Sequence, residues 1–97
     1  MDSEAAIRAL GALAQEHRLA AFRLLVAAGP AGLAAGVLAQ RLKIAPSSLS
    51  FHLTQLAHAG LVAQRREGRS IIYAAEYAEM NHLLGYLSEN CCGGGAC

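Results

Sequence analysis

All three cysteines of the sequence lie within its last seven residues, at a spacing that suits a soft ion. Cys91 and Cys92 are adjacent, and Cys97 follows a Gly-Gly-Gly-Ala stretch. Thiolates bind soft metals, and glycine lets the chain fold back around an ion without strain. Each thiol must ionise before it binds, so binding releases protons. The spacing predicts a three-sulfur site made by Cys91, Cys92 and Cys97.

No evident fourth ligand accompanies these sulfurs. Zinc prefers four ligands in a tetrahedron, which three cysteines alone do not supply. His82 lies more than two helical turns before Cys91 and cannot easily reach the cysteines within one helix. We expect no disulfide framework, because the cysteine count is odd and we expect a reducing compartment. Redox sensing and an incidental tail remain alternatives to ion binding.

A second candidate site begins on a polar helix face. Pro46 suits the first position of a helix, and Leu49, Leu53 and Leu56 recur on one side of it. The opposite side is polar yet nearly uncharged. Hydroxyl and amide groups suit base edges and phosphates, whereas a solvated helix face usually carries Lys and Glu.

A basic hairpin follows that helix. After Gly60, residues 61–66 and 70–74 predict two strands around Glu67-Gly68-Arg69. The net charge is only +1, but the basic residues between Arg41 and Ser70 outnumber the single acidic one. A local basic surface on a near-neutral chain favours a polyanion. The residues expected to contact double-stranded DNA are Ser47, Ser48, Ser50, Phe51, His52, Gln55, Arg65, Arg66 and Arg69.

The remaining segments position these two sites. Helical spacing predicts a first helix through Ile7, Leu10 and Leu13, a second ending near Gly29-Pro30, a third over residues 33–42, and a last one from about Tyr77. A single core of this size is marginal alone. The apolar stripe on the last helix therefore predicts a homodimer interface, with Met80, Leu83, Leu84 and Leu87 as its expected residues.

The sequence predicts a cytoplasmic protein with no membrane partner. Asp2 and Glu4 stand where a secretory signal would carry positive charge. The uncharged stretch 24–40 is interrupted by glycines and Pro30, and it is shorter than the roughly 20 residues that a membrane span needs.

These motifs resemble the ArsR/SmtB family of winged helix-turn-helix repressors. The similar stretches are Leu49-Ser50-Phe51-His52-Leu53, Ala59-Gly60-Leu61-Val62, Arg65-Arg66-Glu67-Gly68-Arg69 with Ile72-Tyr73, and Leu13-Ala14-Gln15-Glu16-His17-Arg18-Leu19. The resemblance covers about residues 5–90. It implies a mainly α fold of order ααααββα, with a DNA-binding and dimerisation domain over 1–90 and a Cys/Gly-rich tail over 91–97. It also implies a homodimer through the first and last helices, with Ile7 and Leu10 of the first helix in the interface. The resemblance further implies that this dimer leaves its operator on binding an inducer.

The sequence departs from the family in two places. The founding arsenic sensors carry a cysteine pair at the start of the third helix, but residues 32–38 contain no ligand. The C-terminal cysteines instead resemble an arsenite-responsive branch. In that family's chemistry, three sulfurs satisfy trivalent arsenic or antimony, so the implied inducer is arsenite or antimonite, with no catalytic cofactor. Phe51 replaces a residue that is often polar, although a phenyl ring can contact a thymine methyl.

Two other functions remain open. A repressor of the same fold could sense another soft metal or thiol oxidation. A protein of another class, a cytoplasmic metal buffer or thiol-exchange protein, could use the helical domain to bind a protein partner. We expect no enzyme, because the sequence contains no visible set of nucleophile, base and orienting group and no phosphate-cradling motif.

Overall fold

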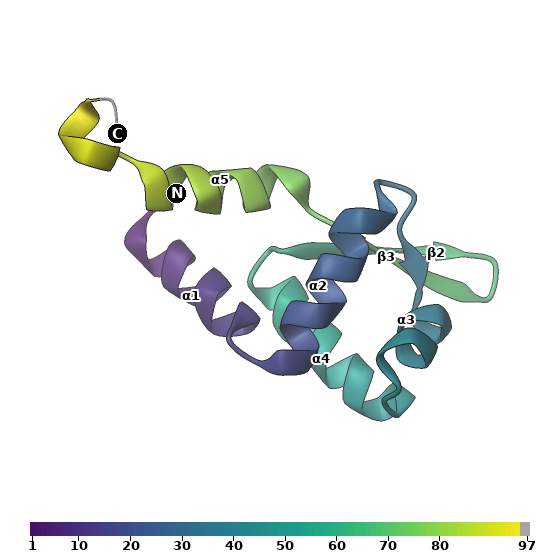
Figure 1. The fold of residues 1–97 in the computed structure, drawn as a ribbon. Helices are drawn as coiled ribbons and strands as arrows, with labels where there is room; N and C mark the ends of the chain where they lie inside the picture. The colour runs from purple at the N-terminus through teal and green to yellow at the C-terminus, as the bar shows by residue number, and fades with distance from the viewer. Residues whose placement is uncertain (96–97) are drawn as a thin grey trace.

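The computed structural model describes residues 1–95 as a helical domain with a β-hairpin at one end and a short tail at the other (Figure 1). The domain is elongated, with extents of 50 × 23 × 21 Å. Its elements, in chain order, are α1 (Ser3–Leu13), α2 (Glu16–Ala28), β1 (Leu33–Ala34), α3 (Ala35–Leu42), α4 (Pro46–His58), β2 (Val62–Glu67), β3 (Ser70–Ala75), α5 (Tyr77–Ser88) and the 3₁₀-helix η1 (Cys91–Gly94).

The core lies where α2, α3 and α4 meet the base of the hairpin. Leu25, Leu38, Leu53 and Leu61 are each at most 1% exposed. Leucines at helical spacing give each helix an apolar side, and burying these sides against one another removes apolar surface from water. Figure 1 shows α2 running through the middle of the domain, with α4 beside it.

A tight turn joins α3 to α4. Lys43 ends α3 in the left-handed region at φ 56°, and its N–H bonds to the carbonyls of Ala39 and Gln40. Pro46 occupies the start of α4, as the sequence predicted. The left-handed Lys43 was not predicted, because this conformation is common only for Gly and Asn at helix ends.

The sheet is antiparallel, with strand order β1-β3-β2. Strands β2 and β3 form the expected hairpin, in which Arg65 pairs with Ile72. The prediction of a helix from Leu33 was wrong at its start, because Leu33 and Ala34 form β1 and pair with Tyr73 and Ile72. A short apolar run has no periodicity that separates a strand from a helix, so tertiary pairing decides it.

The first and last helices lie along the side opposite the hairpin tip. Figure 1 shows α5 passing over α1, and the two helices are in contact. The Tyr77 hydroxyl fixes the start of α5, because it lies 2.9 Å from the Val26 carbonyl oxygen and 3.3 Å from that of Leu25. These carbonyls belong to the last turns of α2, where some carbonyls lack a helical partner.

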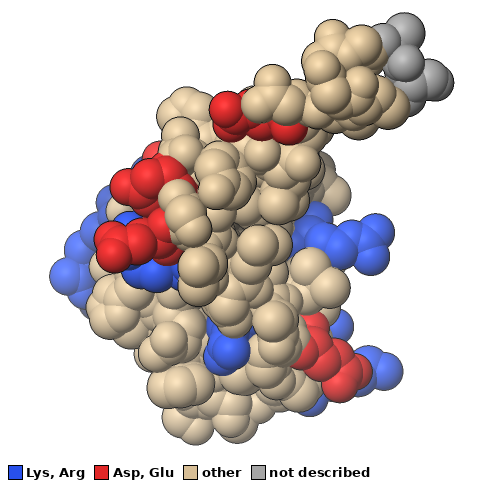
Figure 2. Space-filling view, turned by 90° about the vertical axis from the view of Figure 1, so that its left-hand side faces the viewer, with Lys and Arg blue, Asp and Glu red and all other residues tan. Residues whose placement is uncertain are grey.

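Apolar side chains remain exposed on these two helices. Ile7, Leu10, Leu84 and Leu87 are between 42% and 66% exposed. Figure 2 views the domain from the side where α1 and the tail lie, and most of the surface there is uncharged. Leu83 was predicted to belong to the dimer interface. It instead packs in the core of the protomer and is only 5% exposed. No helix of the described residues is long and apolar enough to cross a membrane.

Candidate nucleic-acid interface

The N-terminal half of α4 presents an exposed polar surface. Ser47, Ser48 and Ser50 are exposed, as is Phe51 at 57%. Leu49 and Leu53 on the other side of the helix are each 1% exposed. This division follows from the leucine spacing, which ties one side of α4 to the core and leaves the other to solvent. The structure thus presents these four predicted DNA-contacting residues on one accessible surface.

His52 is held by α2. The Arg18 Nη1 lies 3.3 Å from His52 Nδ1, and the same guanidinium donates from Nε to the Ala12 carbonyl at 2.6 Å. Because arginine only donates, His52 Nδ1 must accept, which requires a neutral ring with its proton on Nε2. The His17 ring adds a contact at a centroid distance of 5.6 Å. His52 therefore has an internal partner, unlike the serines before it.

Burial and its basic neighbours favour this neutral ring. Partial burial, then the charge of Arg18, then His17, lower the pKa of His52 below its ordinary value of 6.5. All three causes disfavour the charged imidazolium. The ring therefore stays an acceptor for Arg18 at neutral pH.

The arginines of the hairpin fall into two groups. Arg66 and Arg69 are exposed. The Arg65 Nη2 instead donates to the Ala31 carbonyl at 2.7 Å and pairs with Glu67 Oε2 at 3.2 Å. Arg65 thus ties the hairpin to the turn before β1, although its side chain is 44% exposed. All three hairpin arginines are therefore accessible.

The hairpin lies beside the exposed helix surface. A cleft of about 180 Å³ is lined by Pro46 and Ser50 of α4, by Gly36 of α3, and by Ile71 and Tyr73 of β3. A helix surface and a basic hairpin joined in this way can contact a groove and the flanking phosphates of one duplex.

The cysteine tail lies at the other end of the molecule. The Sγ atoms of Cys91 and Cys92 are 4.0 Å apart, and both residues are exposed. Cys92 takes part in a disulfide bond. The sequence had made a disulfide framework unexpected, and this single bond was not predicted. Cys97 lies outside the described residues, and residues 1–95 contain no cluster of three His, Cys, Asp or Glu ligands.

Comparison with known proteins places this arrangement in a family. A family model described as a helix-turn-helix domain matches residues 13–65. The nodulation protein NolR of Rhizobium meliloti is 34% identical over 88 residues, which are 91% of this chain and 70% of that protein. An ArsR-like transcriptional regulator from Rhodococcus sp. RHA1 is 32% identical at a TM-score of 0.76, covering 88% of this chain and 77% of that one.

The chain belongs to the ArsR/SmtB family.

The relatives extend over nearly the whole chain. The structure of HlyU from Vibrio cholerae is 31% identical at a TM-score of 0.74, covering 95% of this chain and 99% of that one. The homodimeric winged helix-turn-helix DNA-binding domain from Mycobacterium bovis covers 97% of this chain and 87% of that one at 26% identity and a TM-score of 0.71. This ArsR/SmtB-family protein is therefore a DNA-binding transcriptional regulator and not an enzyme.

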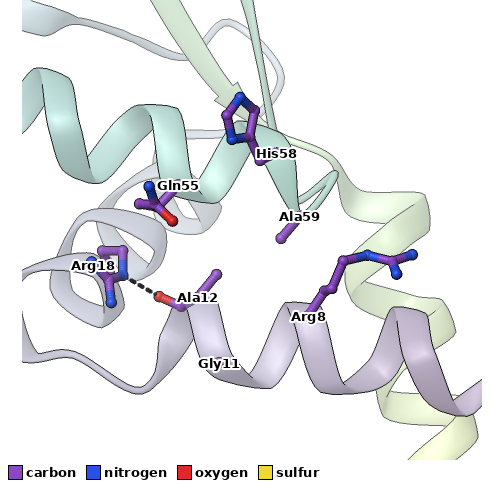
Figure 3. Close-up of a pocket in the computed structure, with 7 residues that line it drawn as sticks. All are labelled: Arg8, Gly11, Ala12, Arg18, Gln55, His58 and Ala59. Atoms are coloured by element: carbon purple, nitrogen blue, oxygen red, sulfur yellow. Dashed lines mark hydrogen bonds between the residues drawn. The ribbon is translucent and has the colours of Figure 1, made fainter.

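Sequence reasoning missed the role of Arg18 in this family member. Figure 3 shows Arg18 bonded to Ala12 of α1, with Gln55 of α4 nearby, at one side of a cavity of about 250 Å³. The sequence around Arg18 resembles the family, but it does not indicate which distant residue the Arg18 side chain contacts. His17 and Arg18 lie 34 or more positions before His52 in sequence, so only the tertiary fold reveals the contact.

Proposed function

We propose that this protein is a cytoplasmic transcriptional repressor that binds operator DNA as a dimer and is released when arsenite or antimonite binds Cys91, Cys92 and Cys97. The single observation that carries the proposal is the pair of Sγ atoms 4.0 Å apart on a glycine-rich tail in a regulator of this family. A relative of known structure is titled a possible transcriptional regulator for arsenical resistance.

The sulfur spacing fits a shared ion. A metal–thiolate bond is about 2.3 Å long, so two sulfurs can share one ion only within about 4.6 Å of each other. The Cys91 and Cys92 sulfurs meet this limit at 4.0 Å. The tail also carries glycines with positive φ, Gly93 at 68° and Gly94 at 92°, which let the backbone turn sharply. When bound, the metalloid would cross-link the thiolates of a reduced tail.

The tail adjoins the helices that we assign to the dimer interface. Helix α5 ends at Ser88, and Cys91 follows within a few residues. An ion bound there changes operator affinity only if it binds one dimer geometry more tightly than another. A coupling free energy of about 1–3 kcal/mol gives roughly 5- to 150-fold weaker operator binding.

Fluorescence anisotropy on reduced protein tests this function. The probe is a duplex selected from a random pool by the wild-type protein, titrated in parallel with arsenite, antimonite, zinc and cadmium. We expect stoichiometric arsenite or antimonite to release the DNA and zinc to leave it bound. The variant with Cys91→Ser, Cys92→Ser and Cys97→Ser is expected to bind DNA normally and to ignore the metalloids.

Three results would oppose this proposal. Operator affinity that is unchanged by stoichiometric metalloid would remove the inducer role. Loss of DNA binding by the triple serine variant, in protein that is still folded, would make the cysteines structural. Release by cadmium with no release by arsenite would instead assign the tail to another soft metal.

The second candidate function is a response to thiol oxidation. The disulfide at Cys92 favours it, and a relative of known structure is titled reduced HlyU from Vibrio cholerae. Operator affinity is then expected to differ between protein treated with diamide and protein kept in a phosphine reductant, with no metalloid present. The triple serine variant should show no such difference, and equal affinities in the wild type would exclude this role.

A further inference from the structure

We propose that Arg18 is a positioning residue for operator binding, because it joins α1, α2 and the DNA-reading helix α4 at one guanidinium. Arg18 connects these helices through its hydrogen bonds to the Ala12 carbonyl oxygen and to His52 Nδ1. The inference rests on DNA binding by the family fold and is independent of any metalloid response.

The first bond caps α1. Ala12 lies one residue before the end of α1, where the last carbonyls have no partner in the helix. A cation at a helix C-terminus also interacts favourably with the helix dipole. The 2.6 Å hydrogen bond from Arg18 Nε gives the Ala12 carbonyl a partner and places a positive charge at the end of α1. It also fixes the end of α1 against the first turn of α2.

The backbone of Arg18 is fixed as well. Gln15 precedes α2, and its side-chain Oε1 accepts from the Arg18 N–H at 3.0 Å. The side chain is partly buried, so few rotamers are open to it. The guanidinium is therefore held in place before any DNA binds.

The second bond reaches α4 in its middle. His52 lies directly after Phe51, which is 57% exposed on the DNA-facing surface. A rotation of α4 that moves Phe51 also moves the His52 ring away from Arg18. Helix α1 carries exposed apolar residues that we assign to the dimer interface. A shift of α1 moves the Ala12 carbonyl and therefore displaces the guanidinium that is bonded to it. Arg18 thus links the dimer side of the protein to its reading helix.

Protonation of His52 would break this link. An imidazolium has no acceptor nitrogen, and its charge would face Arg18 and His17, both from α2. Phe51, the remaining ring in contact, is uncharged. Lowering the pH through the titration of His52 should therefore loosen α4 from α2, even in the folded dimer.

The test compares Arg18→Lys with Arg23→Lys, a matched change at an exposed position of the same helix. Lysine keeps the charge but lacks the planar fork that reaches two acceptors. For folded dimers, verified by circular dichroism and sedimentation, we expect Arg18→Lys to weaken operator binding about 10-fold, which corresponds to about 1.4 kcal/mol. Binding to nonspecific duplex should be unchanged, and Arg23→Lys should resemble the wild type.

A second pair of variants leaves α2 intact. His52→Gln offers an amide oxygen as acceptor for Arg18 and should keep more operator affinity than His52→Leu, which should lose it as Arg18→Lys does. Between pH 7.5 and pH 5.5, the wild type should lose more operator affinity than His52→Gln, because only histidine gains a proton. This pair also replaces Arg18→Lys if that variant does not fold.

Two outcomes overturn the proposal. One is wild-type operator affinity and pH profile in folded, dimeric Arg18→Lys, which would leave only a stabilising contact. The other is an equal loss on operator and nonspecific DNA, together with a salt slope lower by about 1, which would make Arg18 a direct phosphate contact.

Discussion

The reading half of the molecule, α2 to β3, differs from the dimer half, α1 with α5 and the tail, in how its residues are held. In the reading half, Arg18 and Arg65 bond to backbone or ring atoms of distant elements. In the dimer half, Leu84 and Leu87 are more than half exposed, and a Cβ added at Gly11 would meet nothing within 4 Å. The reading half is fixed within the protomer, whereas the dimer half has surface left for a partner.

The two halves therefore differ in two properties of a regulator: how firmly side chains are held, and how much surface is free for a partner. A fixed reading half holds the side chains that we expect to contact DNA in place, so DNA binding does not have to order them first. The apolar surface left uncovered on the dimer half is where we propose that a partner subunit packs and that an inducer changes the geometry. The same substitution made in both halves should therefore have different consequences.

Glycine replacement is expected to give the largest contrast. Gly32 has φ 72°, and a Cβ there would collide with the Tyr73 carbonyl oxygen. We expect Gly32→Ala to lower the free energy of unfolding by about 2 kcal/mol or more. Gly11→Ala in the open helix α1 should instead raise it by about 0.5–1 kcal/mol. Urea unfolding of both variants measures the difference, and equal effects would contradict the contrast.

Charge removal should give an intermediate contrast, seen in DNA binding. Arg66→Gln with Arg69→Gln removes two exposed hairpin cations and leaves Arg65, which is bonded to Ala31. We expect the slope of log affinity against log salt to fall by about 2. Arg8→Gln with Arg23→Gln makes the same charge change on α1 and α2, away from the hairpin, and should leave the slope nearly unchanged. Equal slopes for the two double variants would show that net charge, and not position, sets the affinity.

Histidine replacement should give the smallest contrast, seen in the pH dependence of stability. The folded protein holds the pKa of His52 below 6.5, so the unfolded chain binds a proton first as the pH falls. The contribution of His52 is complete above pH 6.5 and is lost as the pH falls through the folded pKa. We expect His52→Gln to flatten this acid-side decline in thermal unfolding. His82→Gln on the exposed face of α5 should keep it.

Much of the reading half could be predicted from sequence. The leucine spacing and Pro46 located α4, and the turn at residues 67–69 located the hairpin, because helix periods and turn residues act locally. Strand β1 was missed, because two residues form it only by pairing with Tyr73 and Ile72. The exposed serines of α4 were also predicted, since a polar side opposite a leucine side must face solvent.

The sequence by itself determined the helices, the hairpin, the polar surface of α4 and the family. Each of these depends on residues close together in the chain or on motifs. Only the tertiary structure decided that Arg18 holds His52, that Arg65 binds Ala31, and that Leu83 belongs to the protomer core. These contacts join positions far apart in sequence, and a side chain acquires such a partner only when packing of the whole domain brings distant elements together.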